Sequence, residues 1–457
     1  MTDSMNLISA QISFLVSLQR SAAACVSHRR GFIPEQSKQI DLALDTQEPR
    51  LALIHIPIEL YALCLQPILR LLFGEDHDED AAKISWTNRH DFLNISITPV
   101  ECSIICSRYL ADRYVRPHAD LLNNLYASRK GTSQPEIQIS DEDYIVIQVD
   151  GQGLDAGQRV LELTSPLAMA GISIFFITTY FSDYILVPFR SQRTVTKALQ
   201  QRGFVFSKTV DAFVSQLSPS SPTLPHRPAT SSTFYESSVP TTPPAKDIPE
   251  LQIRTFTKLK RNNVSPAVDG HIRLANCAGS REYNQASEER LKNDLLQVLL
   301  ATAAPGSGAA AKSVFGLGWP PSPLPELNYG AKFLSLTITS GEPISVLLEH
   351  RLMDRLGGSV LGAKSEDDAL LPITLDLREL PLEATGIVCG VAGRLAQGDT
   401  DPTELSLGPV SSGAGDPIEI SFLSTARAGT VIVRANQLEK ALAALEYGMK
   451  RVGGAES

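Results

Sequence analysis

Short apolar runs separated by polar turns dominate this sequence, and residues 172–187, ISIFFITTYFSDYILV, are the clearest example. The run is rich in β-branched and aromatic residues, but Thr178, Thr179, Ser182 and Asp183 interrupt it. A membrane-spanning helix needs about 20 mostly apolar residues, whereas strands on either side of a polar turn are shorter. The pattern therefore predicts two core strands and no membrane span.

Strict alternation is a second pattern, and it occurs in KFLSLTIT at residues 332–339. Leu334, Leu336 and Ile338 alternate with serine and threonine. This is the period of a strand that buries one face and exposes the other. PISVLLE follows after a Ser-Gly-Glu turn, so we predict a half-buried hairpin.

Apolar stripes at helical spacing follow several predicted strands, as in ELYALCLQPILRLLF at residues 59–73 and NQLEKALAALEYG at residues 436–448. Together these patterns divide the chain into four modules with an arm, a linker and an insertion. The predicted boundaries are an arm at 1–45, modules at 50–135, 140–216, 250–365 and 370–450, a linker at 217–249 and a mobile insertion at 399–417.

The second and fourth modules also resemble each other. Phe176-Ile177-Thr178-Thr179 matches Phe422-Leu423-Ser424-Thr425, and each match is followed by a second apolar run. The chain therefore reads as a duplicated pair of modules. Each module has a βαββαβ-like order, which is typical of a ferredoxin-like α+β unit with helices on one face of an antiparallel sheet. The predicted fold is four such modules arranged as two tandem pairs.

Composition narrows the classes of partner. The 457 residues are 43% hydrophobic and 20% charged, with a net charge of −9 and no long basic run. Nucleic acid and anionic membrane surfaces are therefore not expected partners. Residues 217–249 are rich in serine, threonine and proline and poor in apolar residues, which predicts a disordered linker. Six scattered cysteines without metal-finger spacing and no signal peptide indicate reduced thiols in a cytoplasmic protein.

The sequence motifs that would indicate catalysis or cofactor binding are incomplete. GSGAAAKS at 306–313 lacks the glycine that precedes the lysine of a phosphate loop, and GQGLDAG at 151–157 lacks the third glycine of a dinucleotide loop. The acidic run EDHDED at 75–80 lacks calcium-loop spacing, and no GxSxG elbow is present. We therefore expect no catalytic residues, no metal and no cofactor, and a protein that is not an enzyme.

Three segments resemble a known family. AGISIFFITTYFSDYILV is similar to the second ACT domain of the CASTOR family, the cytosolic arginine sensors upstream of TORC1. EATGIVCGVAGRLA with IEISFLST resembles the fourth ACT domain of that family, and ELYALCLQPILRLLF resembles the first. The likeness covers most of residues 50–215 and 250–450. It is specific in the second domain, moderate in the fourth and thin in the third.

The resemblance implies four ACT modules, a homodimer, and an amino acid bound between the second and fourth modules. It also implies that the ligand controls contact with a protein regulator of TORC1. Carried over by position, the ligand-binding residues are Ser173, Ile174, Pro381, Ala384, Thr385, Gly386, Val388, Thr425, Ala426 and Gly429.

Two of these positions depart from the family. Arginine-sensing members have a Glu and an Asp where this chain has Ala384 and Gly429. A guanidinium buried without a carboxylate partner is unfavourable by several kcal/mol. We therefore expect the ligand to be a smaller or less charged amino acid than arginine.

Other interpretations stay open at this point. Ser173 and Thr425 fit ordinary strand positions, and Gly386 and Gly429 fit turn glycines. A ligand-free ACT scaffold that acts through its linker and surfaces is one alternative. A regulatory module that acts in trans on an enzyme of amino-acid biosynthesis is another.

Overall fold

The structure is a computed structural model in which the chain divides into two units, Met1–Gln39 and Ile40–Ser457. Only the second unit contains described residues, and all that follows concerns it. The structure describes residues 41–43, 50–74, 86, 89–127, 135–149, 156–202, 204–207, 245–279, 285–303, 332–362, 369–382, 384–397 and 418–452.

Strands and helices follow one another along the described chain, and two strands often come in succession. The strands are β1 (Asp41–Ala43), β2 (Leu51–Pro57), β3 (Phe92–Ile97), β4 (Glu101–Ser107), β5 (Gln138–Ile139), β6 (Tyr144–Val149), β7 (Phe175–Thr178), β8 (Asp183–Pro188), β9 (Val205–Ser207), β10 (Leu274–Gly279), β11 (Leu334–Thr339), β12 (Ser345–Glu349), β13 (Val360–Gly362), β14 (Leu370–Asp376), β15 (Ile420–Ser424) and β16 (Ala428–Arg434). The helices are η1 (Ile58–Cys64), α2 (Leu65–Phe73), α3 (Arg108–Leu110), η4 (Ala111–Val115), α4 (Arg116–Ala127), α5 (Ala156–Met169), η5 (Phe189–Ser191), α6 (Gln192–Gln200), α7 (Ile248–Arg261), α8 (Gln285–Ala303), η6 (His350–Leu352), α10 (Met353–Leu356), α11 (Ile387–Gln397), η9 (Ala435–Gln437) and α12 (Leu438–Arg451).

The prediction of four ferredoxin-like modules in two tandem pairs is wrong. The strands form one ring in the order β2-β4-β3-β11-β12-β10-β14-β16-β15-β7-β8-β6, and a β2–β6 pairing closes it. Every pairing in the ring is antiparallel, so these twelve strands make a closed antiparallel β-barrel. Four separate modules would leave strand edges exposed, and an unpaired edge leaves its N–H and C=O groups unsatisfied. In this fold those edges pair with one another instead.

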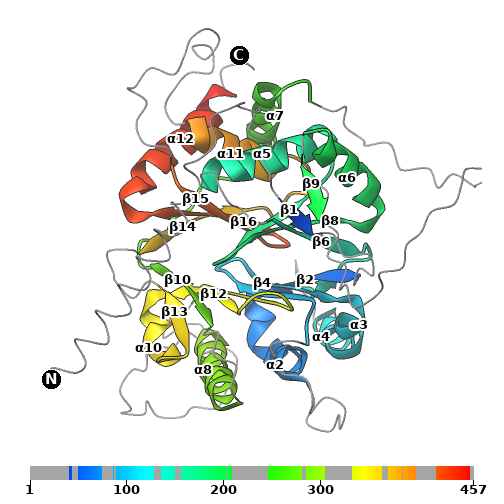
Figure 1. The fold of residues 1–457 in the computed structure, drawn as a ribbon, viewed down its shortest axis with the longest axis vertical. Coiled ribbons are helices and arrows are strands. Elements are labelled where there is room, and N and C mark those ends of the chain that lie inside the picture. The colour runs from blue at the N-terminus through cyan, green and yellow to red at the C-terminus, as the bar shows by residue number, and fades with distance from the viewer. Residues whose placement is uncertain are drawn as a thin grey trace, which may run out of the picture. The chain divides into compact units, whose positions relative to one another are not determined.

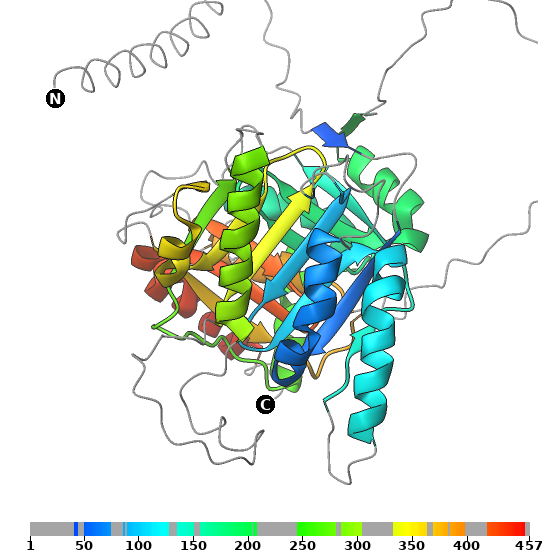
Figure 2. The ribbon, with the colours of Figure 1, turned by 90° about the horizontal axis from the view of Figure 1, so that it is seen from below.

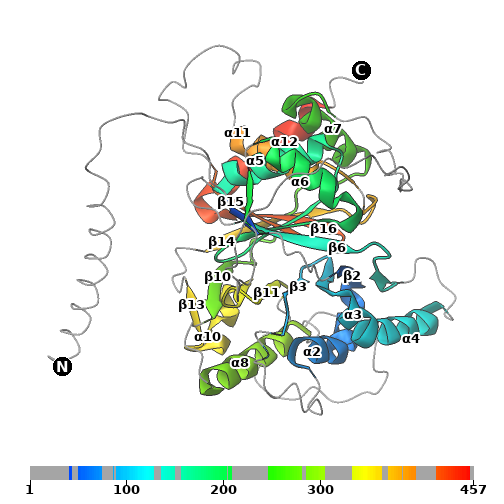
Figure 3. The same cartoon turned by 45° about the vertical axis from the view of Figure 1, so that its right-hand side comes forward.

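Helices cover the ring from outside on two sides (Figures 1 and 3), and the inner faces of its strands pack against a core inside it. One helix layer contains α5, α6, α7, α11 and α12, and the other contains α2, α4, α8 and α10. Figure 2 shows α2, α4 and α8 side by side across the strands that they cover. One apolar core lies under each helix layer, and a third, with Leu53, Tyr184, Leu347 and Ile432, lies inside the ring.

The burial of both faces corrects the prediction of a half-buried hairpin. All six residues of β11 are buried, including Ser335 and Thr337. Asn94 Nδ2 of the neighbouring β3 donates to their hydroxyl oxygens at 3.2 and 3.0 Å. The alternation in KFLSLTIT therefore separates an apolar face from a polar face that is buried inside the ring, not from solvent.

The two copies of the internal repeat lie side by side where β7 pairs with β15, and this pairing has a single register pair. Phe176 N donates to Ser424 Oγ at 3.0 Å, and Phe422 N donates to Thr178 Oγ1 at 3.1 Å. Exchanging the two repeats exchanges these two hydrogen bonds. The β7–β15 junction therefore has local two-fold symmetry, and side-chain hydroxyls replace part of its main-chain ladder.

Several predicted features lie outside the described residues. They include the arm up to residue 40, most of the linker, the insertion at 399–417, and the segments GSGAAAKS, EDHDED and the start of GQGLDAG. The predicted linker runs to residue 249, but helix α7 already begins at Ile248, so the last residues of that prediction are helical instead. Asp247 caps this helix by accepting a hydrogen bond from Glu250 N at 2.8 Å, and a proline occupies its first turn. In the part of the chain that is described, no helix is long and apolar enough to cross a membrane.

Candidate functional site

The structure brings part of the predicted site together at the β7–β15 junction. Ile177 of β7 pairs with Leu423 of β15 in antiparallel register. The chain before β7 therefore runs toward the turn after β15. This aligns Ser173 and Ile174 with the turn that contains Thr425.

The loop before α11 approaches the same core. Ile174, Ala384 and Val388 all pack against the cluster beneath the α5–α11 helix layer. Ala384 N donates to Pro381 O at 2.9 Å, which folds the loop back on itself. Gly386 has φ +82°, a conformation that L side chains rarely adopt. Two of the predicted ligand-binding segments, one before β7 and one before α11, thus pack against the same apolar core.

Several predicted ligand-binding groups already have partners within the chain. Thr425 Oγ1 donates to Glu101 Oε1 at 2.6 Å, and Ala426 N donates to Ser103 Oγ at 3.2 Å. Thr255 Oγ1 donates to the carbonyl of Gly386 at 3.0 Å. Gly429 lies within the β14–β16–β15 ladder, where a Cβ would meet the rings and methyls of neighbouring side chains at 3.6 to 3.7 Å. The turn at Thr425 is therefore held by the structure itself.

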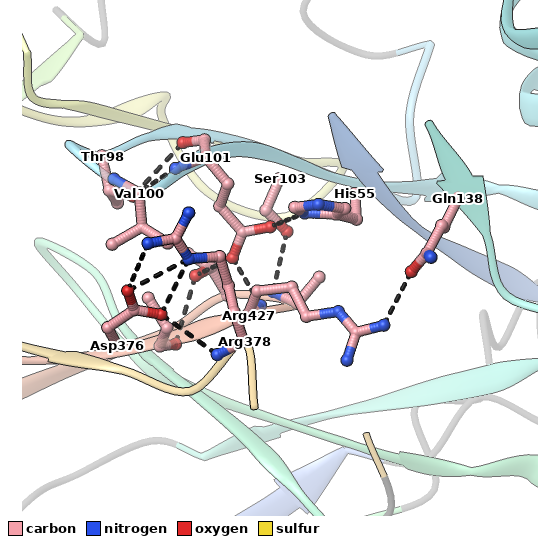
Figure 4. Close-up of polar contacts among 12 residues, drawn as sticks. His55, Thr98, Val100, Glu101, Ser103, Gln138, Asp376, Arg378 and Arg427 are labelled. Atoms are coloured by element: carbon pink, nitrogen blue, oxygen red, sulfur yellow. Dashed lines mark hydrogen bonds and ion pairs between the residues drawn. The ribbon is translucent and has the colours of Figure 1, made fainter. Parts of the chain in front are cut away.

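Glu101 is the residue that holds this turn, and Figure 4 shows it between His55 and the backbone of Arg427. Its side chain has no exposed area. Oε2 lies 2.5 Å from His55 Nδ1, and Oε1 accepts from both Thr425 and the Arg427 amide. A buried carboxylate must be paired and hydrogen-bonded to be tolerated. Glu101 therefore fastens β4 to the β15–β16 turn.

Arg427 connects the turn to two further segments. Its guanidinium donates to Leu380 O at 3.3 Å and to Gln138 Oε1 at 2.7 Å, and its carbonyl accepts from Leu377 N at 2.9 Å. Figure 4 shows the side chain extended toward Gln138. The start of the loop before α11 is thus fixed to the β15–β16 turn.

Asp376 and Arg378 form an exposed ion pair at the edge of this cluster, with 2.6 Å between Arg378 Nη2 and Asp376 Oδ2. Burial alone would raise the pKa of Asp376, but the hydrogen bonds from Arg378 outweigh it and lower the pKa. The pair keeps the carboxylate ionised and occupied by Arg378.

A second carboxylate makes a related contact on the other side of the ring. Glu342, in the β11–β12 turn, accepts from the Ser182 hydroxyl, from Tyr184 Oη at 3.0 Å and from Gln148 Nε2 at 3.0 Å. Tyr180 N donates to Ser345 Oγ at 2.9 Å, as Ala426 N does to Ser103 Oγ. Glu342 thus holds the β7–β8 turn as Glu101 holds the β15–β16 turn.

Sequence reasoning missed Glu101, Arg427 and the helix α7. One signal was available for Glu101, since it stands at the start of the largely apolar segment CSIIC, which forms a buried strand. An acidic residue at such a position needs a partner when the strand is buried. Its partners lie 46 positions away at His55 and more than 300 positions away at Thr425 and Arg427, so the sequence offers no local sign of them.

The described residues do not support a metal site or a reactive thiol. Among them, no three His, Cys, Asp or Glu side chains are placed to hold a metal ion. The five described cysteines are free and buried, and burial raises the pKa of the Cys64, Cys106 and Cys277 thiols to about 12. Thiols with such pKa values are poor nucleophiles at neutral pH.

Substitution of Gly386 by alanine is expected to destabilise the loop before α11. The new Cβ would lie 2.9 Å from Leu251 Cδ1 at a φ of +82°, so we expect a loss of about 1–2 kcal/mol in the free energy of unfolding. Urea denaturation of the variant measures this. Gly341→Ala is the control, because nothing lies within 4 Å of its Cβ position. Equal stability of the two variants would contradict the strain at Gly386.

In comparisons with known proteins, one family model matches a segment that includes part of this site. Residues 139–201, which hold β6, α5, β7, β8 and α6, match the family model of the ACT domain. No curated protein matches the chain.

Solved structures with detectable similarity include aspartate kinases. An aspartate kinase from Synechocystis is 10% identical, with 94% of this chain and 59% of that chain covered and a TM-score of 0.28. This chain therefore spans less than two thirds of that kinase. Protein Atu0741 from Agrobacterium tumefaciens is 17% identical, with 39% and 98% covered and a TM-score of 0.24. The regulatory subunit of aspartate kinase from Thermus flavus is 13% identical, with 37% and 99% covered and a TM-score of 0.25. The match of residues 139–201 to the ACT model shows one ACT domain in the chain, and this range includes Ser173, Ile174 and β7.

Proposed function

We propose that this protein is a non-enzymatic regulator that binds an amino acid at the β7–β15 junction. The ACT match over residues 139–201 supports a ligand-binding regulatory role. The observation that carries the proposal is that Ile174, Ala384 and Val388, from segments far apart in the sequence, pack against one core cluster. The main-chain groups of Ser173 and Ile174 would hold the amino and carboxylate ends of the ligand, as the CASTOR resemblance implies.

The resemblance extends the proposal to signalling. In this extended proposal, the protein is a cytoplasmic homodimer, and the bound ligand changes the contact between the protein and a regulator of TORC1. A ligand that touches both the ACT domain and the loop before α11 would favour the arrangement in which the two lie closest. Such a shift requires the ligand to bind that arrangement more tightly than the open one.

Arginine is not the ligand that this site favours. Ala384 packs against the apolar core, and the space at Gly429 is bounded by Phe422 and Leu377. Neither position offers a carboxylate, and the nearby Glu101 is fully committed to His55, Thr425 and the Arg427 amide. Among the described residues of this site, a guanidinium would therefore lack the paired partner that its desolvation requires.

A thermal-shift screen of the full chain against the twenty amino acids tests the proposal. We expect one amino acid or a small related group to raise the melting temperature. A ligand at a hundredfold excess over its Kd stabilises the folded chain by about 2.7 kcal/mol. Ser173→Ala should reduce the shift, and Ser191→Ala, at the start of α6 and outside the predicted site, should leave it unchanged. An arginine response as large as any other would contradict the proposed ligand class.

A ligand-free scaffold is the second candidate, and one observation favours it. The hydroxyl of Thr425 and the carbonyl of Gly386 are already used by Glu101 and Thr255. If no amino acid shifts the melting temperature, these internal bonds have replaced the ligand. Affinity purification of the full chain would then be expected to recover the same partner with and without added amino acids.

A further inference from the structure

Helix α7 lies along the loop that the proposed ligand would touch. Leu251 reaches within 2.9 Å of the Cβ position at Gly386, Thr255 bonds the Gly386 carbonyl, and Lys258 Nζ donates to the Thr385 carbonyl at 3.3 Å. These three residues are spaced four and three apart, so they share one face of the helix. The face of α7 that contacts the loop therefore carries a positive charge, the Lys258 ammonium, near the C-terminal end of the helix.

The charge of Lys258 has no carboxylate partner within the described part of the chain. Its neighbour Arg254 is paired with Glu250 at 2.5 Å, whereas Lys258 Nζ bonds only a carbonyl. Burial, reinforced by Arg254, lowers the pKa of Lys258. An ammonium group has three N–H donors, and one carbonyl satisfies one of them. The site thus contains a half-buried positive charge that a ligand anion would compensate.

A second cation binds the same loop at its other end. The Arg427 guanidinium donates to Leu380 O and to the amide of Gln138, and neither partner is charged. Near this loop, the Glu101 carboxylate is committed to His55 and Thr425 and the Asp376 carboxylate to Arg378, while Glu379 is exposed beside Arg378. The two cationic side chains that bond the loop, Lys258 and Arg427, therefore have only uncharged hydrogen-bond partners among the described residues.

We propose that the ligand carries a carboxylate on its side chain, as aspartate and glutamate do, and that Lys258 is the residue that selects this charge. The inference rests on the proposed function, because it assigns the side chain of the bound amino acid to the end of the site at Thr385. With the amino and α-carboxylate groups held at Ser173 and Ile174, an acidic side chain would extend toward the Lys258 ammonium. A charge-assisted hydrogen bond there would be stronger than the neutral one that an amide makes.

Titration calorimetry with L-glutamate, L-glutamine and L-arginine on the full chain tests this inference. We expect L-glutamate to bind about tenfold more tightly than L-glutamine, since a bond to a charged group is stronger by about that factor. Lys258→Met should abolish the difference by weakening glutamate alone, and Lys258→Arg should preserve it. Lys260→Met, which removes an exposed charge from the same helix, should change neither Kd.

The outcomes separate the two proposals. Binding of L-glutamine as tight as that of L-glutamate, or an unchanged preference in Lys258→Met, would overturn the role of Lys258 and leave an amino-acid site standing. No binding of any of the three, together with no response in the screen of twenty amino acids, would overturn both. Glu383 lies outside the described residues. A preference for glutamate that emerges only in Glu383→Gln would show that Glu383 already neutralises Lys258, and this too would overturn the inference.

Discussion

Replacing Glu101 with alanine is expected to lower the free energy of unfolding by about 3–5 kcal/mol, because it leaves three hydrogen-bonded groups in the interior without an acceptor, at about 1–3 kcal/mol for each group. The substitution leaves His55 Nδ1, the Thr425 hydroxyl and the Arg427 amide without their acceptor. Each of these groups bonds Glu101 within the interior, where water cannot readily replace it. Denaturant unfolding followed by circular dichroism measures the loss.

Two matched variants sharpen the result. Glu101→Gln keeps an acceptor oxygen and should lose less, about 1–3 kcal/mol. Glu342→Ala removes the related carboxylate, which is only partly buried and whose partners are hydroxyl and amide groups. Its loss should be about 1–2 kcal/mol. If Glu342→Ala were as damaging as Glu101→Ala, the complete burial of the Glu101 carboxylate would not be the cause.

The same comparison separates stability from ligand response. Glu101 touches the turn at Thr425, whereas Glu342 touches the turn at Ser182, which the proposed site does not use. An amino acid that stabilises the unaltered chain should therefore stabilise Glu342→Ala to a similar degree and Glu101→Gln much less. Glu101 acts through the turn, so it is a positioning residue.

Strands and helices were largely predictable because apolar periodicity is a local property. ISIFFITTYFSDYILV folds as β7 and β8 around a turn, as its polar interruption predicts. The period of KFLSLTIT was also read correctly as a strand, but its environment was not. Ser335 and Thr337 face the Asn94 side chain instead of water. A buried polar face and a solvated one have the same pattern, and only the partner strand distinguishes them.

The closed barrel could not be predicted from these local patterns. Its joints pair strands from different parts of the chain, and three of them, β2–β6, β10–β14 and β7–β15, rest on one register pair each. Nothing in the residues of β2 specifies β6 as a neighbour. A module boundary drawn from composition therefore says little about which sheet edges remain open.

The candidate site shows the same limit. The repeat of Phe176 to Thr179 in Phe422 to Thr425 was visible in the sequence, and the structure pairs these segments at one junction. The residues that fix the junction, Glu101 and Arg427, were missed. They act between segments whose proximity only the fold establishes.

Truncation of Phe422 to alanine is expected to be the second large loss, about 3–5 kcal/mol in the free energy of unfolding. Its side chain is fully buried beneath the α11 layer, and the ring lies 3.6 Å from the Cβ position of Gly429. Phe176→Ala removes the equivalent ring of the other repeat, which is also fully buried, so it should lose a similar amount. Phe189→Ala, at a ring with 36% exposure, should lose less than about 1 kcal/mol. Urea unfolding of the three variants measures these losses. A large difference between Phe176→Ala and Phe422→Ala would show that the two halves of the junction are not equivalent, and the local two-fold symmetry would then be geometric only.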